Sequence, residues 1–299
     1  MKIGVVLPIS QFDDASGDIA PYPVIRDMAV SAESAGLDSV WVFDHLLFRS
    51  DEGTSGIHEC WTVLAAIAEA TARVQLGTLV MCTGFRNPAL LAKMAGTLDH
   101  VSGGRLILGV GCGWHDPEYE AFGFPADHKV GRFEEALAII HDLVRDGQSD
   151  LEGRFHAVRD AVLVPPARPD IPILVAAKRP RMLDLTARYA DAWNAAWHGL
   201  PDEPLAAKRA ALREACERAG RDVRTIEDTV GVSVSFPDLL APSSDPPVRT
   251  LSGPAEAIAD GLRAHESAGA DHVIASLTPA TPTALRRFVE AVQRYRGAA

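Results

Sequence analysis

Short apolar segments alternate with longer amphipathic segments along almost the whole chain, and this alternation limits the fold more than any other feature. Each apolar segment has the length of a buried strand, and most amphipathic segments end near a glycine or proline, as helices do. Repeated strand–helix units predict a parallel sheet with crossover helices. About eight such units are present, which is the number that closes a (β/α)8 barrel. An open doubly wound sheet is the alternative, and it usually uses fewer strands.

The expected elements follow one another with two interruptions. Strands are predicted at Ile3–Leu7, Ser39–Phe43, Val74–Met81, Leu106–Val110, Ile173–Ala176, Ala192–Ala196, Val230–Phe236 and His272–Leu277, and helices at Tyr22–Ala35, Trp61–Ala72, Pro88–Val101, Val130–Arg145, Arg181–Tyr189, Leu205–Ala219, Ala255–Ala268 and Thr283–Tyr295. Residues 153–172 hold four prolines and no helical pattern, which predicts an excursion or a small hairpin. Residues 237–254 are rich in Pro, Ser and Asp and are predicted to loop over the barrel mouth. We therefore expect a single barrel domain over residues 1–299, with both excursions at its carboxyl face.

The chain carries a formal charge of −11, which argues against several classes of partner. No basic surplus is present to neutralise phosphates, so we expect neither nucleic acid nor anionic membrane as a partner. No apolar run approaches the roughly 18 residues that span a bilayer, and the N-terminal segment lacks the length and charge of a signal peptide. The four cysteines show no C-x-x-C spacing, which favours reduced thiols and a cytoplasmic location.

A glycine-rich stretch follows the fourth predicted strand. Gly109, Gly111 and Gly113 alternate there, and Trp114 and then the carboxylates of a helix start come directly after them. Glycines let a flat ring lie close to the backbone, and a barrel builds its site where its strands end. The spacing is G-x-G-x-G and so lacks the dinucleotide fingerprint. Trp114 is a candidate either to stack on a planar ligand or to pack at the rim, and Glu118 faces either the site or solvent.

Two other strand ends carry candidate site residues. Asp44 and His45 follow the second predicted strand. An imidazole exchanges a proton near neutral pH and a neighbouring carboxylate orients a ring or a ligand, although a plain surface pair is the alternative. Residues 176–181 follow the fifth strand and bring Lys178 and Arg179 to a helix start. Free N–H groups and cations would hold a phosphate there, and an ordinary basic turn is the alternative.

Other chemistries find little support in the sequence. The ten histidines show no metal-ligand spacing and no G-x-S-x-G motif is present, so we expect neither a metal centre nor a serine nucleophile. Cys82 and Cys112 follow strands, but nothing nearby indicates a lowered thiol pKa, and we interpret them as small apolar residues. Composition alone assigns Arg86 to a loop before a helix start.

Four segments in this order resemble the bacterial-luciferase-like family of flavin- and deazaflavin-dependent oxidoreductases. They are residues 35–45 (AGLDSVWVFDH), residues 76–99 from LGT through RNP to LD, residues 102–114 from SGGRL to GW, and residues 188–194 (RYADAWN). The resemblance covers nearly the whole chain. Within the family, the Asp44-His45 pair, the segment Phe85-Arg86-Asn87-Pro88 and the segment Gly111-x-Gly113-Trp114 are most similar to the branch that uses coenzyme F420, a 5-deazaflavin.

The resemblance implies a barrel with the cofactor ring at the strand ends. It implies that Asp44 contacts the cofactor and that His45 transfers a proton or stabilises a charged intermediate. It also implies a non-proline cis peptide between Leu79 and Val80 that presses on the ring. Cys82, Thr83, Gly111, Cys112 and Gly113 would line the ring, and Ala176, Ala177, Lys178, Arg179 and Arg181 would hold the phosphate.

Two positions depart from the family pattern. Relatives often have two glycines where this chain has Ala176 and Ala177, whose methyl groups would crowd a phosphate, while the added basic charge beside them favours an anion. Deazaflavin dehydrogenases of sugar phosphates place a glutamate about where this chain has Trp114. That specific activity is therefore not expected, because Glu118 is poorly spaced to replace the glutamate.

The leading hypothesis is hydride transfer between coenzyme F420 and a small organic substrate, with His45, Trp114 and Glu118 as candidate catalytic residues. The first alternative is a monooxygenase that uses reduced FMN and oxygen and is fed by a separate reductase. The second is a flavin-binding or interaction barrel without turnover. Exposed apolar positions on the helices predicted at Trp61–Ala72 and Pro88–Val101 permit a symmetric dimer, which is the default expectation.

Overall fold

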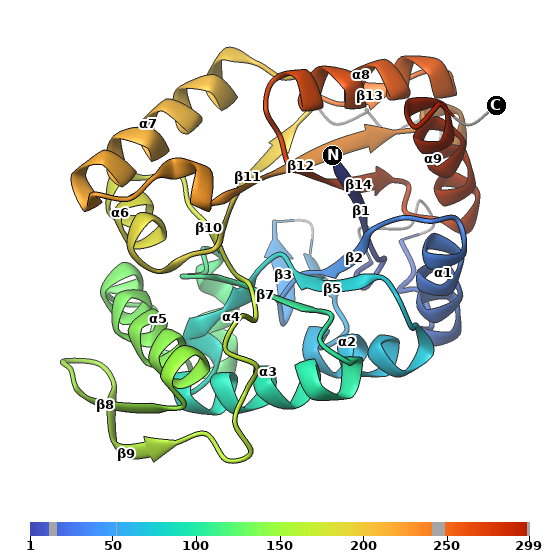
Figure 1. Ribbon diagram of the computed structural model, residues 1–299. Coiled ribbons are helices and arrows are strands. Elements are labelled where there is room, and N and C mark those ends of the chain that lie inside the picture. Colours follow the sequence, from blue (N-terminus) through green and yellow to red (C-terminus); the bar gives the residue numbers. More distant parts are fainter. Residues whose placement is uncertain (12–16, 52, 241–248, 298–299) are drawn as a thin grey trace.

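Eight parallel strands form a closed barrel in the computed structural model, which describes residues 1–11, 17–51, 53–240 and 249–297 (Figure 1). In chain order these strands are β1 (Lys2–Val6), β2 (Ser39–Val42), β5 (Gln75–Thr78), β7 (Leu106–Gly111), β10 (Ile173–Ala176), β11 (Ala192–His198), β12 (Glu227–Ser235) and β14 (His272–Thr278). Each pairs in parallel with the next barrel strand, and β14 pairs with β1. The predicted barrel is confirmed and the open sheet is excluded, because no barrel strand is left with an unpaired edge.

Helices connect the strands and form the outer ring of the molecule (Figure 1). They are α1 (Tyr22–Ser34), α2 (Cys60–Ala70), α3 (Pro88–Ser102), α5 (Lys129–Asp146), α6 (Pro180–Tyr189), α7 (Glu203–Ala219), α8 (Ala255–Ser267) and α9 (Pro282–Tyr295). A further short helix, α4 (Asp116–Phe122), lies between β7 and α5. No helix in these ranges is both long and apolar enough to cross a bilayer.

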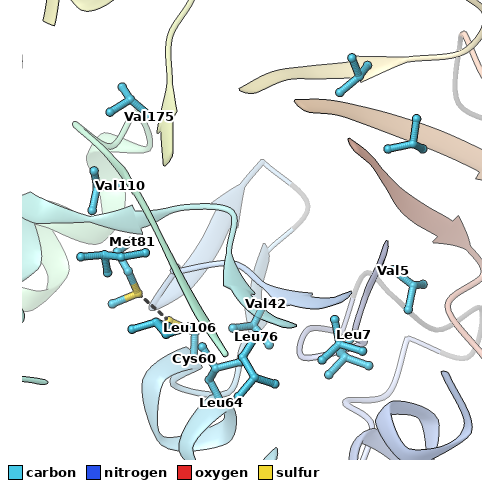
Figure 2. Packing of buried hydrophobic residues seen from close by; sticks show 14 of the residues in the cluster. Val5, Leu7, Val42, Cys60, Leu64, Leu76, Met81, Leu106, Val110 and Val175 are labelled. Atoms are coloured by element: carbon cyan, nitrogen blue, oxygen red, sulfur yellow. Dashed lines mark hydrogen bonds between the residues drawn. The ribbon is translucent and has the colours of Figure 1, made fainter. Parts of the chain in front are cut away.

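The strands bury side chains on both of their faces. Outward-facing residues such as Leu76 and Leu106 pack against Cys60 and Leu64 of α2, as Figure 2 shows. Inward-facing residues form a second cluster inside the barrel, made of Val6, Trp41, Ile107, Leu174, Ala192 and Ile274. Strands buried on both faces need nearly continuous apolar sequence. This requirement explains why apolar runs identified the strands so well.

Three aspartates fasten the amino ends of neighbouring barrel strands. Asp38, Asp191 and Asp271 each directly precede a strand (β2, β11 and β14). Their carboxylates accept the backbone N–H of Ile3 (2.7 Å), Ile173 (2.8 Å) and Asp228 (2.8 Å), respectively. An aspartate before a strand therefore closes the ladder at the amino face of the barrel, while the carboxyl face remains for the site.

A chain of polar side chains links the amino ends of β2, β14, β12 and β1. The Trp41 indole Nε1 donates to Ser39 Oγ (2.7 Å), which lies 2.8 Å from His272 Nε2. His272 Nδ1 lies 3.5 Å from Glu227 Oε1, and Lys2 Nζ lies 3.1 Å from the same oxygen. The hydrogen bond with His272 and the charge of Lys2 outweigh burial and lower the pKa of Glu227 to about 2.

This lowered pKa predicts an acid-dependent loss of stability. In the unfolded chain this carboxyl has its ordinary pKa of 4.5. Its ionised form therefore stabilises the folded state fully above pH 4.5, and this stabilisation is lost as the pH falls toward about 2. The contribution is about 3 kcal/mol. Urea unfolding of Glu227→Gln should therefore show a smaller loss of stability between pH 5 and pH 2 than the native chain. The control is Glu69→Gln, an exposed carboxylate on α2. Parallel losses in all three proteins would contradict the assignment.

Three corrections to the predicted elements concern the breaks and excursions of the chain. The strand predicted at Val74–Met81 is broken, because β5 ends at Thr78 and β6 (Met81–Cys82) starts after a cis peptide between Leu79 and Val80. A hairpin of β3 (Leu47–Ser50) and β4 (Gly53–Gly56) was not expected, since each strand has four residues and β4 contains only Gly, Thr and Ser. The excursion predicted at 153–172 contains a hairpin that starts earlier, with β8 (Gln148–Glu152) and β9 (Ala157–Val162).

The second excursion follows β12 and is only partly described. Its first residues form a short 3-10 turn, Pro237–Leu239, and its later strand β13 (Leu251–Ser252) pairs with β12. Residues 241–248 of the predicted mouth loop lie outside the described residues. The described part therefore extends the barrel wall at β12.

Candidate active site

The residues predicted to do chemistry gather at the carboxyl ends of β2, β5 and β7. Asp44 and His45 follow β2, and the cis peptide Leu79–Val80 follows β5 as the resemblance implied. Strand β6 pairs with the end of β7, where Cys82 lies opposite Gly111. Because these three barrel strands are neighbours, residues about 70 positions apart in the sequence meet at one rim.

Asp44 is buried, and its carboxylate pairs with Arg86, which composition alone had assigned to a loop. Arg86 Nη1 lies 2.5 Å from Oδ2 and Nη2 lies 3.1 Å from Oδ1. The backbone N–H of Cys82 also donates to Oδ2 (2.8 Å). Burial alone would lower the pKa of Arg86, but the charge and hydrogen bonds of Asp44 raise it. Arg86 therefore stays charged, and the Asp44 carboxylate positions the backbone of Cys82 at the rim.

The same guanidinium joins Asp44 to a second carboxylate. Arg86 Nη2 donates to Glu59 Oε1 (2.8 Å), and Glu59 caps α2 by accepting the N–H groups of Trp61 and Thr62. Asp44, Glu59 and Cys60 are close enough together to bind a metal ion. Their chemistry fits the ion pair better, because Arg86 already pairs with both carboxylates and burial raises the pKa of the Cys60 thiol.

His45 and Glu118 form the pair of side chains best suited to acid–base chemistry. His45 Nδ1 lies 2.8 Å from Glu118 Oε1, and Glu118 Oε2 accepts the backbone N–H of Leu46 (2.8 Å). Glu118 is 1% exposed, so its carboxylate faces the site and not solvent. With Nδ1 engaged, the imidazole has Nε2 available for a ligand. The structure thus brings together two of the three predicted catalytic residues by direct contact.

Trp114, the third predicted catalytic residue, lies beside the same imidazole. Its ring centroid is 5.5 Å from that of His45 in an edge-to-face arrangement. The indole is 67% exposed, so it is not a core residue. Phe48 of the unexpected hairpin approaches His45 more closely, with 4.4 Å between centroids. Sequence reasoning missed Phe48 because the apolar run that contains it, Leu46–Phe48, is too short to predict a strand.

Close packing inside the protein accounts for the three alternating glycines in and just after β7. A Cβ on Gly109 would lie 1.8 Å from the carbonyl oxygen of Thr78, and one on Gly111 would lie 2.7 Å from Val80 Cγ2. Gly113 has a φ of +71°, and a Cβ there would lie 2.0 Å from Tyr119 Oη. The glycines therefore let the chain around the cis peptide and α4 pack onto β7.

The cysteines at the rim are buried thiols. Cys82 Sγ lies 2.9 Å from Tyr119 Oη, and the same hydroxyl donates to the carbonyl oxygen of Cys112. Burial raises the pKa of Cys82 to about 12, and burial also raises the pKa of Cys112. Burial therefore disfavours the thiolate form of both residues. Thr83, the next predicted residue, is buried and its hydroxyl donates to the carbonyl oxygen of Gly111 (3.3 Å).

The predicted phosphate segment lies at the end of the adjacent strand β10. Ala176 is half-buried, whereas Ala177 is buried and its carbonyl oxygen accepts the indole N–H of Trp193 (2.9 Å). Lys178 and Arg179 are exposed, and α6 begins after Arg179 without a side-chain cap. Arg181 is also exposed, but its guanidinium is paired with Glu134 of α5 (2.6 Å). Lys178, Arg179 and the first N–H groups of α6 thus lie together at the end of β10.

Comparisons with known proteins agree with this architecture. Residues 1–238 match the family model described as luciferase-like monooxygenase. The chain belongs to the luciferase-like family. A relative from Amycolatopsis mediterranei, named F420-dependent glucose-6-phosphate dehydrogenase, is 31% identical over 243 residues, which cover 79% of this chain and 69% of the relative. The resemblance inferred from four sequence segments is confirmed, and the chain is an enzyme of this family.

The chain is also similar to two other proteins. The phthiodiolone/phenolphthiodiolone dimycocerosates ketoreductase of Mycobacterium tuberculosis is 37% identical over 229 residues, covering 70% of this chain and 60% of the relative. An F420-dependent secondary alcohol dehydrogenase, solved in complex with an F420-acetone adduct, superposes over 99% of both chains with a TM-score of 0.80. At 20% identity, this structural likeness concerns the fold.

Proposed function

We propose that this luciferase-like enzyme transfers hydride between the deazaflavin coenzyme F420 and a small organic substrate. The observation that carries the proposal is the His45–Glu118 pair, in which a buried carboxylate holds a proton-exchanging imidazole at the rim of the barrel. The names of the relatives support it, since the dehydrogenase from Amycolatopsis mediterranei depends on F420.

The side chains at the rim fit an anionic cofactor with a flat ring. Leu79 and Val80 offer a half-buried apolar surface to the ring. Lys178, Arg179 and the first N–H groups of α6 would bind the phosphate, and Arg181 adds positive charge. When bound, F420 supplies a two-electron hydride carrier. Asp44, Cys82, Thr83, Gly111, Cys112, Gly113, Ala176 and Ala177 would complete the site around the ring and its tail.

His45 would manage the proton that accompanies hydride transfer. Because Glu118 binds Nδ1, Nε2 would meet the substrate oxygen. In the reductive direction, hydride reaches the carbonyl carbon while Nε2 donates a proton to the oxygen; in the oxidative direction, Nε2 accepts that proton. Glu118 stabilises the imidazolium and fixes the ring orientation in both directions.

A monooxygenase that uses reduced FMN is the second candidate. The description of the matching family favours it, and the same rim would hold an isoalloxazine ring. This activity would consume oxygen and would need a separate reductase to supply reduced FMN. A barrel that binds a flavin without turnover is the third, and it would bind the cofactor but catalyse neither reaction.

We also propose a homodimer in the cytoplasm, formed through α3 and the segment after β9. Leu90 and Val101 on α3 are 54% and 50% exposed, and Val162 and Val164 nearby are 64% and 71% exposed. The Lys93 ammonium bonds to the carbonyl oxygen of Val164, so the two segments form one face. Exposed apolar side chains gathered on one face favour self-association. Sedimentation of the native chain tests this, and a monomer at micromolar concentration would contradict it.

Titration of the chain with F420 and with FMN tests the proposed function directly. Fluorescence should report saturable binding of F420, with weaker binding of FMN. Turnover of secondary alcohols or ketones should then proceed at the same rate with and without oxygen. Oxygen-dependent turnover with reduced FMN would favour the monooxygenase, and failure to bind either cofactor would overturn both.

A further inference from the structure

Three rings form a continuous surface beside His45. Phe48 and Trp114 lie 6.0 Å apart between centroids, and His115 lies 5.4 Å from Phe48 and 5.3 Å from Trp114. We call Phe48, Trp114 and His115 the aromatic wall. Both Phe48 and Trp114 also contact the His45 ring, at 4.4 Å and 5.5 Å. The wall therefore flanks the group that would exchange the proton.

The wall joins two segments that are far apart in the sequence. Phe48 belongs to β3, whereas Trp114 and His115 lie between β7 and α4. The backbone N–H of Arg49 donates to His115 Nε2 (3.1 Å), which ties the hairpin to the start of α4. His45 and Glu118 make a second connection between the same segments. Two independent links hold the wall at a fixed place relative to the imidazole.

The exposure of the tryptophans is the observation that points to a ligand. Trp41 and Trp193 are 0% exposed and Trp61 is 8% exposed, so these three belong to the core. Trp114 and Trp197 are 67% and 42% exposed, and both come at the carboxyl ends of barrel strands. Covering a large ring that is exposed to water with an apolar group lowers the free energy. Trp114 is such a ring, and it lies next to His45.

We propose that the aromatic wall selects substrates whose carbonyl or carbinol carbon carries an apolar, planar group. This inference rests on the proposed hydride transfer. The planar group would stack on Trp114 and Phe48, which places the substrate oxygen toward His45 Nε2. In reduction, the carbonyl carbon gains a hydride from reduced deazaflavin, the oxygen gains a proton from Nε2, and the deazaflavin is oxidised. The reverse step removes a hydride and a proton from the alcohol.

A selectivity ratio tests the wall with F420-loaded protein. The substrate pairs are acetophenone with 1-phenylethanol and acetone with 2-propanol, so that both directions are covered. The native chain should prefer the phenyl pair. Trp114→Ala should lower the ratio of kcat/KM for the phenyl pair over the small pair by about tenfold, mostly through KM. Trp114→Phe, which keeps a ring, should recover most of this ratio.

A matched control separates the wall from exposed aromatic residues in general. Phe122, at the end of α4, is 52% exposed and is not part of the wall. Phe122→Ala should leave the ratio within about twofold of the native value, a span of about 0.4 kcal/mol. An unchanged ratio in Trp114→Ala, or an equal fall in Phe122→Ala, would overturn the proposal.

A binding measurement keeps the test independent of turnover. Saturation-transfer NMR with acetophenone should show transfer to its phenyl protons in the native chain and in Phe122→Ala, and a loss of transfer in Trp114→Ala. If F420 does not bind, the proposed function fails while this measurement still decides the wall. If F420 binds but acetophenone shows no transfer that depends on Trp114, the wall alone is overturned.

Discussion

Replacing His45 with alanine should lower kcat for F420-dependent turnover by about 10²- to 10⁴-fold, the usual range for a lost acid–base group. The substitution removes the Nε2 that would exchange the proton with the substrate oxygen. It also leaves the Glu118 carboxylate, 1% exposed, without its partner at Nδ1. Anaerobic measurement of deazaflavin oxidation or reduction with a secondary alcohol or ketone checks the rate. Undiminished turnover would remove His45 from the mechanism.

Two further measurements separate proton transfer from binding. The dissociation constant of F420, taken from fluorescence, shows whether the cofactor still enters the site of His45→Ala. Glu118→Gln retains an acceptor for the His45 ring but removes the charge that stabilises an imidazolium. We therefore expect Glu118→Gln to reduce kcat less than His45→Ala does. A larger reduction in Glu118→Gln would reassign the main role to the carboxylate.

The barrel was predictable because its strands must bury both faces. Runs such as Leu106–Val110 and Ile173–Ala176 are apolar almost throughout, as the strands of a parallel sheet covered on both faces are. β12 was predicted to begin at Val230 but starts at Glu227. Contacts with His272 and Asp271 hold the polar residues at its start in the sheet. A polar strand start carries no apolar signal, so its pairing is visible only in three dimensions.

The candidate site was predictable in part for a related reason. The Asp44–His45 pair lies at a strand end, and the order of the strands brings it to the rim. The partners of these residues could not be inferred from periodicity: Arg86 looks like a loop residue and Glu118 like a solvated helix start. A buried carboxylate needs a cation or hydrogen-bond donors, and this requirement could have prompted a search for a partner of Asp44.

Replacing Arg86 with methionine should destabilise the fold by about 3–5 kcal/mol, because it leaves a buried carboxylate without its cation. The Asp44 side chain is 1% exposed and that of Arg86 is 12% exposed, so water cannot replace the guanidinium. Such a loss is a large part of the about 5–15 kcal/mol that stabilises a typical domain. Urea unfolding of the native chain and of the variant measures the difference.

Two control variants assign this loss to the buried charge. Arg181→Met breaks an exposed ion pair with Glu134 and should cost at most about 1 kcal/mol. The double variant Asp44→Asn with Arg86→Met removes both charges and should recover part of the stability that Arg86→Met alone loses, since the remaining amide still accepts the N–H of Cys82. If the double variant is less stable than Arg86→Met, an unpaired Asp44 carboxylate does not cause the loss of stability. The guanidinium would then stabilise the rim by packing.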